Sequence, residues 1–215
     1  MNSNLQGSNS DAKAAIPNQG ERLPVSRYAL FFWPLLIGAG LDLYTKSYVF
    51  GRYFDPLLAR TRPPDVADHW WVDQIFGIQT STNPGALFGF GKGYSTLFAA
   101  FSIVALVGIF VWLFPLRAAR DRWLAFATGL ISGGIIGNFY DRIGWGYVST
   151  NPIEMKYSVR DWIYFRLEGV RFFDPWPNFN IADSVLVTGA IMLFLHAFLF
   201  ATPQQSKEVA AQINT

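Results

Sequence analysis

Four long apolar stretches alternate with polar segments along the chain. They cover residues 28–50, 94–114, 123–143 and 183–201. Each is close to the ~20 residues that an α-helix needs to cross a hydrocarbon core of ~30 Å. The pattern predicts an all-α polytopic membrane protein with four transmembrane helices in one domain, residues 28–201.

The first stretch is predicted to be a retained span. It lacks the small-residue cleavage site of a secretory signal peptide, and it carries Asp42 and Lys46 within its apolar run.

The polar segments differ in length and composition. Residues 1–27 are rich in Asn, Gln and Ser and show no periodicity, which predicts a disordered tail, and residues 202–215 form a second polar tail. Two long connections cover residues 51–93 and 144–182. The first contains strand-like patches from Trp70 to Thr82 and ends in a glycine-rich segment.

Basic residues predict the orientation in the membrane. The short link between the second and third spans holds Arg117, Arg120 and Arg122, and Arg22 and Arg27 precede the first span. Basic residues close to spans mark the cytoplasmic side. Both termini are therefore expected in the cytoplasm, and both long connections outside it.

Composition supports a membrane protein and narrows its chemistry. The chain is 51% hydrophobic and only 15% charged, against about 25% charge in a typical soluble domain. A net charge of +2 gives no argument for nucleic acid as a partner. The chain has no cysteine, and its two histidines, His69 and His196, are far apart in sequence. We therefore expect no metal, no thiol chemistry and no cofactor.

Several charges fall at one depth. Asp42 lies about 22 Å and Lys46 about 28 Å along the first helix from Arg27, at 1.5 Å per residue. Asp141 lies about 27 Å from the start of the third helix. These groups share the outer level with Asp183, at the start of the last span. A charge within the hydrocarbon costs about 2.5–3.5 kcal/mol, so such groups are usually paired or functional.

Their spacing allows pairing. Asp42 and Lys46 are four residues apart on one helix face, with the acid first. Asn138, Asp141 and Arg142 share a face of the third span. Structural ion pairs explain part of this pattern, but the gathering of so many groups in one layer favours a functional site.

Three glycines predict close helix packing. Gly129, Gly133 and Gly137 repeat every four residues in the third span. This pattern lets a neighbouring helix approach closely.

The remaining chemistry is that of carboxylates. Asn180 can cap the last helix, which puts Asp183 in its first turn, and a capping role alone is the simpler explanation for Asp183 in isolation. Two acids that face each other share a proton, so one can activate water while the other protonates the substrate. Asp141, Asp161 and Asp174 remain possible partners for Asp183, and these patterns do not choose among them.

Five segments, in this order, resemble the bacterial lipoprotein signal peptidases (signal peptidase II): LDLYTK at 41–46, NPGALF at 83–88, GGIIGNFYDR at 133–142, VRDW at 159–162 and FNIADS at 179–184. The resemblance implies an intramembrane aspartyl endopeptidase that removes signal peptides from diacylglyceryl-modified prolipoproteins, cutting before the lipidated cysteine. It also implies a small extracytoplasmic β-rich cradle, around residues 70–88, that grips the substrate.

The resemblance assigns site residues by motif position. Asp161 and Asp183 match the catalytic aspartates of the family. The residues that match those lining or bracing the site are Asp42, Lys46, Asn83, Gly85, Asn138, Asp141, Arg142 and Asn180. Lipidated prolipoproteins and membrane lipids are the implied partners. We expect a monomer in the bacterial inner membrane, with its active site near the outer face.

The chain departs from the family pattern before Asp161. Residues 149–158 are interpreted as an insertion; otherwise the first carboxylate is lost, or Asp141 takes its role. Pro84 and Leu87 also vary the second segment.

Two other classes remain as hypotheses. A proton-coupled transporter or channel component would also hold intramembrane Asp and Lys, but it predicts charges at mid-membrane and an inverted repeat, neither of which the sequence has. A non-catalytic assembly subunit would leave the acids dispensable.

Overall fold

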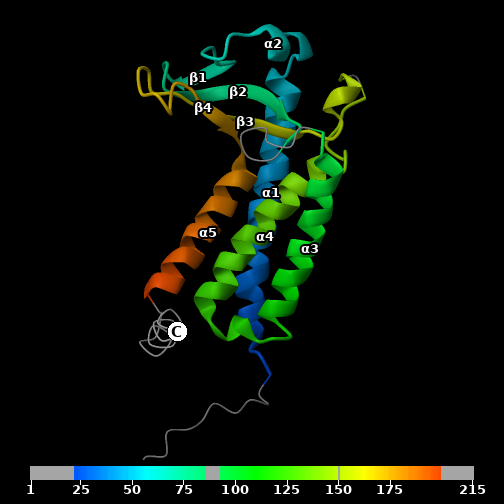
Figure 1. Ribbon diagram of the computed structural model, residues 1–215, viewed down its shortest axis with the longest axis vertical. Helices are drawn as coiled ribbons and strands as arrows, with labels where there is room; N and C mark the ends of the chain where they lie inside the picture. Colours follow the sequence, from blue (N-terminus) through cyan, green and yellow to red (C-terminus); the bar gives the residue numbers. More distant parts are fainter. Residues whose placement is uncertain (1–21, 86–92, 150, 200–215) are drawn as a thin grey trace, which may run out of the picture.

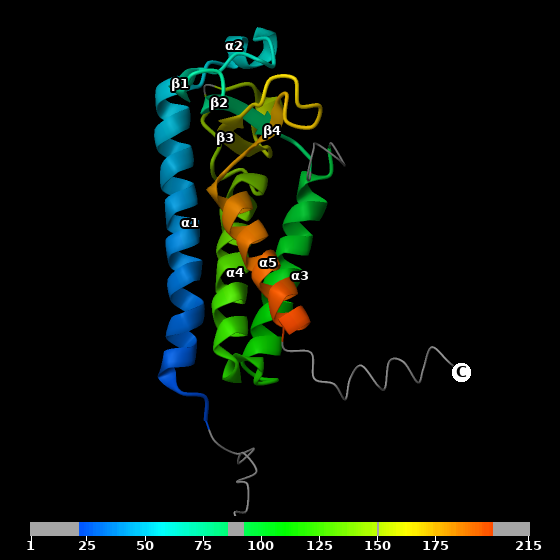
Figure 2. The same ribbon diagram turned by 90° about the vertical axis from the view of Figure 1, so that its left-hand side faces the viewer.

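Long helices run side by side, and a small sheet covers one end of them (Figure 1). The computed structural model describes residues 22–85, 93–149 and 151–199. The long helices are α1 (Val25–Tyr53), α3 (Ser95–Leu113), α4 (Arg122–Arg142) and α5 (Ile181–Leu199). The start of α1 and the end of α5 both lie at the end of the bundle away from the sheet (Figure 2).

Helix boundaries agree closely with the four predicted stretches. The largest difference is at the first, because α1 begins at Val25 and so includes the last three residues of the predicted tail 1–27. The rest of that tail up to residue 21, and the predicted tail 202–215, lie outside the described residues.

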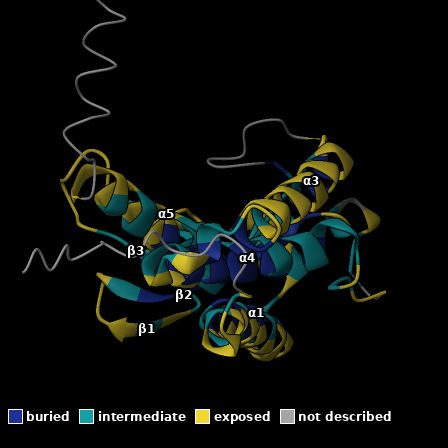
Figure 3. Ribbon diagram, turned by 90° about the horizontal axis from the view of Figure 1, so that it is seen from below, coloured by how far each residue is buried: buried dark blue, intermediate teal, exposed yellow. Residues whose placement is uncertain are grey.

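Helix α4 occupies the centre of the bundle and contacts α1, α3 and α5 (Figure 3). Its glycines explain how closely its neighbours approach. A Cβ at Gly129 would lie 2.4 Å from the Phe31 carbonyl oxygen of α1, and a Cβ at Gly134 would lie 2.4 Å from the Ala182 carbonyl oxygen of α5. The glycines of α4 thus allow the close helix packing that their spacing predicts.

In the part of the chain that the structure describes, three helices, α1, α3 and α5, are long and apolar enough to cross a membrane. The 21-residue α4 is not among them: it has Arg122 at its start, Asp141 and Arg142 at its end, and several glycines between. Helix α4 can hold these residues because the other helices surround it.

The sheet has four antiparallel strands in the order β1-β2-β3-β4. They are β1 (His69–Val72), β2 (Phe76–Asn83), β3 (Val159–Phe165) and β4 (Trp176–Phe179). The predicted strand-like patches correspond to β1 and β2, whereas residues 86–92 of the glycine-rich segment lie outside the described residues. Strands β2 and β3 pair with Ser81 opposite Asp161, so residues from both long connections meet in one sheet.

An apolar cluster joins the sheet to the C-terminal end of α1. Val49 of α1, Ile78 of β2 and both Trp162 and Ile163 of β3 are buried against each other. Because these side chains are at most 7% exposed, strand β3 is fixed relative to the helices.

The segment between α1 and β1 is attached to the same sheet by polar contacts. It contains the short helix α2 (Pro56–Thr61), which Asp55 caps. Arg62 then donates to the Asp68 carboxylate and to the Thr80 carbonyl oxygen. Asp68 also accepts hydrogen bonds from the Thr80 backbone N–H and hydroxyl, each at 2.7 Å.

Candidate active site

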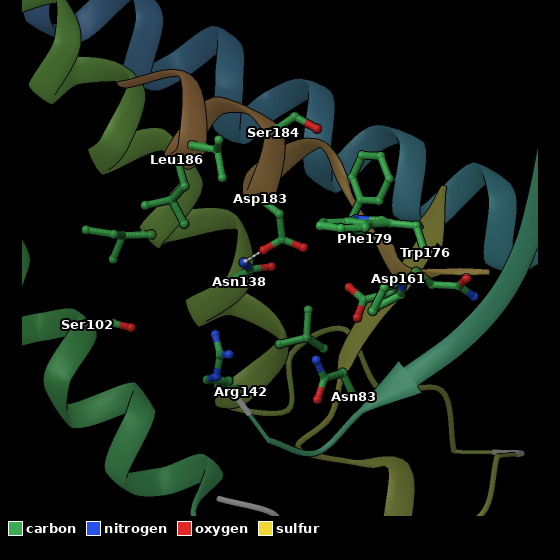
Figure 4. Close-up of a pocket in the computed structure, with 15 residues that line it drawn as sticks. Asn83, Ser102, Asn138, Arg142, Asp161, Trp176, Phe179, Asp183, Ser184 and Leu186 are labelled. Carbon is green, nitrogen blue, oxygen red and sulfur yellow. Dashed lines mark hydrogen bonds between the residues drawn. The ribbon is translucent and has the colours of Figure 1, made fainter. Parts of the chain in front are cut away.

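Asp161 and Asp183 line one cavity of about 550 Å³, where the sheet meets α3, α4 and α5. They point into it from opposite elements, Asp161 from β3 and Asp183 from the start of α5 (Figure 4). Apolar side chains such as Leu186 and Val187 form much of the remaining wall.

The start of α5 holds Asp183 in place through a reciprocal cap. The Asp183 backbone N–H donates to Asn180 Oδ1 at 2.9 Å, and the Asn180 backbone N–H donates to Asp183 Oδ2 at 3.2 Å. This is a capping box with Asn and Asp in place of the more usual Ser and Glu. The other carboxylate oxygen, Oδ1, accepts from Asn138 Nδ2 of α4 at 2.7 Å.

Strand β3 presents Asp161 from the other side of the cavity. Its side chain is buried, and it accepts hydrogen bonds from Asn180 Nδ2 at 2.7 Å and from the Asn83 side chain. Burial, and next the nearby negative charge of Asp183, raise the pKa of Asp161 to about 8. At neutral pH, therefore, Asp161 is the carboxyl group that holds a proton.

Two asparagines connect the carboxyl groups. Asn180 Nδ2 contacts Asn138 Oδ1 at 3.1 Å as well as Asp161, while Asn138 Nδ2 contacts Asp183. A continuous hydrogen-bonded path thus runs from Asp161 through both amides to Asp183, and it fixes the two carboxyl groups relative to each other.

Lys46 contacts this hydrogen-bonded path at Asn138. Its ammonium group lies 2.7 Å from Asp42 Oδ2, 3.1 Å from Asp141 Oδ2 and 3.0 Å from Asn138 Oδ1. Asp42 also accepts from the Ala182 backbone N–H of α5 at 2.9 Å. All three charged side chains are at most 1% exposed, so the pairing avoids the large cost of an isolated buried charge.

Arg160 completes the charge cluster. Its Nε donates to Asp141 Oδ1 at 2.8 Å, and its backbone N–H donates to Asp141 Oδ2 at 3.1 Å. Because side chains alternate along a strand, Arg160 faces away from the cavity into which Asp161 points. The motif VRDW thus contributes to both faces of the sheet.

Arg142 lines the cavity between α3 and the two aspartates (Figure 4). Its Nη2 donates to the Gly85 carbonyl oxygen at 3.3 Å. The Gly85 backbone N–H donates in turn to Asn83 Oδ1 at 3.0 Å. Arg142 therefore links the end of α4 to the segment that follows β2.

The structure brings together all ten residues that the resemblance assigns to the site. Asp174, one of the three possible partners of Asp183, lies elsewhere, in the loop between β3 and β4. It pairs with Arg166 at 2.6 Å, and this pairing lowers the pKa of Asp174. Asp141 is committed to Lys46 and Arg160, which leaves Asp161 as the acid that faces Asp183 across the cavity. The catalytic role of either aspartate stays a prediction.

One side of the cavity is formed by residues that were not predicted from the sequence. Ser102 of α3 and the β4 residues Trp176, Pro177, Asn178 and Phe179 also line it. Trp176, Pro177 and Asn178 directly precede the segment FNIADS, which begins at Phe179, and this proximity was an available signal. Ser102 had none, because it lies in an otherwise uniform apolar helix.

A second opening reaches Asp161 from the sheet side. It is a groove of about 520 Å³, lined by Gln79, Ser81 and Asn83 of β2 and by Trp176 and Asn178 among others. Asn178 Nδ2 donates to the Gln79 carbonyl oxygen at 2.8 Å and to Ser81 Oγ at 3.1 Å, which joins the groove's walls. Asp161 therefore faces both an apolar cavity and a more polar groove.

Comparisons with known proteins agree with this arrangement. The family model described as signal peptidase (SPase) II matches residues 35–199. A lipoprotein signal peptidase from Rhodopirellula baltica is 45% identical over 185 residues, covering 86% of this chain and 78% of that protein. Another, from Geobacillus kaustophilus, is 32% identical over 178 residues, covering 83% of this chain and 99% of that protein.

One solved structure has a similar fold. It is described as a bacterial membrane enzyme, and it matches with a TM-score of 0.62 and 23% identity, over 86% of this chain and 93% of the other. No support for a transporter or channel component comes from these relatives. By sequence over most of its length, the chain belongs to the signal peptidase II family of aspartic peptidases.

Proposed function

We propose that Asp161 and Asp183 form the catalytic pair with which this peptidase removes signal peptides from diacylglyceryl-modified prolipoproteins, cutting before the lipidated cysteine. The observation that carries the assignment is the convergence of the two carboxyl groups on one cavity, each held by hydrogen bonds to Asn138 or Asn180. The third candidate, Asp141, has its oxygens occupied by Lys46 and Arg160.

The two carboxyl groups have different surroundings, which suggests a division of labour. Asp161 holds the proton at neutral pH, because burial and Asp183 raise its pKa to about 8. Asp183 accepts hydrogen bonds from Asn138 Nδ2 and from the Asn180 backbone N–H, and it lies at the positive end of the α5 dipole. Asp183 then takes a proton from water, whose oxygen adds to the scissile carbonyl carbon, while Asp161 donates its proton to the carbonyl oxygen. When the C–N bond breaks, Asp183 gives its proton to the leaving amine nitrogen and Asp161 takes one back from a hydroxyl of the tetrahedral intermediate, so the pair holds one exchangeable proton throughout.

The surrounding residues have supporting roles in this proposal. Asn138 and Asn180 orient the carboxyl groups, while Asp42, Lys46 and Asp141 hold Asn138 and the start of α5 in place. The residues that border the substrate from the sheet and α4 sides are Asn83, Gly85 and Arg142.

The two openings suit the two parts of the substrate. The larger cavity is walled by apolar side chains of α4 and α5, which suits the lipid chains and the apolar signal peptide. The groove along β2 offers polar side chains and strand backbone, which suits an extended peptide. Asp161 lies where the two meet, so the bond to be cut lies between them.

The proposal includes the placement in the membrane. Helices α1, α3 and α5 cross the bilayer, and α4 crosses as a fourth span that these helices shield. The basic residues of the short link favour a cytoplasmic location for both termini. The sheet and the catalytic pair then lie near the outer face of the bacterial inner membrane, where a monomer meets lipidated prolipoproteins among the membrane lipids.

The test uses three matched substitutions. Asp161→Asn and Asp183→Asn each keep size and shape but remove the titrating group, and Asp174→Asn makes the same change in the loop between β3 and β4. Conversion of a purified lipidated precursor is followed by gel shift and mass spectrometry. We expect a loss of at least about 10²–10⁴-fold for the first two, the range for acid–base groups, and conversion close to that of the unaltered enzyme for the third. Normal conversion by either of the first two variants would defeat the assignment.

A further inference from the structure

A second cavity lies behind the strand that carries Asp161. It measures about 410 Å³ and opens between the outer end of α1 and the connection from α4 to β3. The α1 side contributes Ser47, Phe50 and Gly51, and the α4 side contributes Tyr140 and Trp145. It shares no lining residue with the cavity of the aspartate pair, so the catalytic proposal leaves it without a use.

Arg160 supplies the positive charge of this second cavity. Among the described residues that line it, Arg160 is charged and none is acidic. Arg160 is only 9% exposed. Its Nε is satisfied by Asp141, whereas its Nη2 is buried and has no hydrogen-bond partner among the described residues. A buried donor without a partner is costly, and more so when it is charged, so an acceptor brought to this guanidinium is favoured.

The side chain of Arg160 lines the cavity and is 11% exposed. The central carbon of its guanidinium lies 5.9 Å from the centre of the Phe50 ring. On another side is Gly146, where an added Cβ would lie 2.7 Å from Nη2. Gly146 therefore packs directly against the guanidinium, where a larger residue would not fit, and it also lines the cavity.

The position of the cavity in the membrane points to the source of the acceptor. Phe50 and Gly51 lie in the last turn of α1, an apolar helix long enough to span a membrane. Trp145, at the mouth of the cavity, is 70% exposed and stacks edge-on with Tyr140 at 5.8 Å between ring centres. Exposed Trp and Tyr side chains at the end of a span mark the level of the lipid headgroups. The groups that reach a cavity at this level are phosphate esters.

We propose that this cavity binds the phosphate of an anionic phospholipid from the outer leaflet, with Arg160 as its counter-charge and the aromatic side chains against the upper part of its acyl chains. Arg is suited to this role because its planar guanidinium pairs with phosphate through two parallel hydrogen bonds. The bound lipid pairs with the guanidinium from the cavity side while Nε stays with Asp141.

The proposed lipid site lies outside the catalytic cavity, but both are built on strand β3. Arg160 is adjacent to Asp161 on β3, and its carbonyl oxygen lies 3.5 Å from Asn180 Nδ2, which also contacts Asp161. A lipid bound at Arg160 therefore orders the strand from which Asp161 projects.

The experiment compares two glycines of α1. Gly51 lines the cavity and Gly40 does not, and an added Cβ at either meets nothing within 4 Å. Gly51→Phe fills the cavity, whereas Gly40→Phe places the same ring elsewhere on the same helix. The full chain is purified in detergent, and retained lipid is counted by native mass spectrometry with phosphatidylglycerol or phosphatidylcholine added.

We expect the unaltered protein and Gly40→Phe to retain one phosphatidylglycerol molecule at least about tenfold more tightly than phosphatidylcholine, and Gly51→Phe to lose this preference. Arg160→Gln is expected to lose it as well, and if that variant does not fold, Gly51→Phe still decides. Equal binding of the two lipids, or an undiminished preference in Gly51→Phe, overturns the proposal. A separate titration with inorganic phosphate tests the source: displacement of the lipid by millimolar phosphate overturns a lipid site in favour of a free-anion site.

Discussion

The alkaline limit of activity offers a direct test of how Asp161 is tuned. Since burial and Asp183 raise the pKa of Asp161 to about 8, and since the proposed mechanism needs its proton, activity falls as the pH rises through about 8. One unit above the pKa, about one tenth of the enzyme keeps that proton. We expect activity at pH 9 to be about tenfold below its plateau.

The informative perturbation is Asn180→Ser. Ser can still cap α5, but it is too short to reproduce the 2.7 Å hydrogen bond from Asn180 Nδ2 to Asp161. That bond stabilises the ionised form of Asp161 and so lowers its pKa. A hydrogen bond to a charged group contributes about 1.5–3 kcal/mol, and one pKa unit corresponds to about 1.4 kcal/mol. Removing the bond therefore raises the pKa by about one to two units.

The direction of the pKa shift depends on which form of Asp161, ionised or protonated, loses its hydrogen-bond donor. Because the ionised form of Asp161 is weakened, the proton is held to higher pH, and the alkaline limb moves from about 8 to about 9–10. The maximum rate is expected to fall at the same time, since Asn180 also contacts Asn138 and orients both carboxyl groups.

The assay is the pH profile of kcat/KM for a lipidated precursor peptide in one detergent at constant ionic strength. Asn178→Ser is the matched control, because Asn178 lines the same cavity but contacts Gln79 and Ser81 rather than Asp161. It should leave the limb in place even if KM changes. A flat profile up to pH 9.5 in the unaltered enzyme, or a limb that does not move in Asn180→Ser, would refute the reasoning.

Three further predictions concern stability. Gly134→Ala should destabilise the folded protein by about 1–3 kcal/mol, because the new Cβ would lie 2.4 Å from the Ala182 carbonyl oxygen. The control, Gly108→Ala in α3, should be neutral or stabilising, because nothing lies within 4 Å of a Cβ there. Thermal unfolding in detergent compares the two variants, and equal melting temperatures would contradict the close packing at Gly134. Lys46→Met should lower the free energy of unfolding by about 3–5 kcal/mol, because it leaves Asp42 and Asp141 buried without their shared cation. Thermal unfolding in detergent compares this variant with the conservative Lys46→Arg. Asp68→Ala should weaken the attachment of the segment around Arg62 to β2 by about 1–3 kcal/mol, because the Thr80 N–H and hydroxyl lose their acceptor while only the hydrogen bond from Arg62 to the Thr80 carbonyl oxygen remains. Faster hydrogen exchange at Thr80 with unchanged exchange in α4 is the expected result, and unchanged exchange at Thr80 would count against it.

Much of the helical framework could be predicted from the sequence. The reason is that length and apolar content respond to one strong constraint, the thickness of the hydrocarbon core. The spacing of Gly129, Gly133 and Gly137 indicated close packing because residues four apart share a helix face. Asn180 and Asp183 were recognisable because a capping box is local in sequence.

The partner of Asp183 could not be predicted from spacing. Asp161 and Asp183 are 22 residues apart with a hairpin between them, and the register that sets Asp161 opposite Ser81 depends on a strand from the other long connection. Only the resemblance favoured Asp161. The ion pairs of Asp174 with Arg166 and of Asp141 with Lys46 and Arg160 are tertiary contacts that the sequence did not indicate.

The composition of α4 has a consequence for biogenesis. This helix carries glycines, Asn138, Asp141 and Arg142 where α3 carries almost uniform apolar residues. A nascent segment of that kind partitions poorly into lipid on its own. Since only eight residues separate the end of α3 from the start of α4, we expect the two to leave the translocon as a hairpin, with α4 secured once α1 and α5 enclose it.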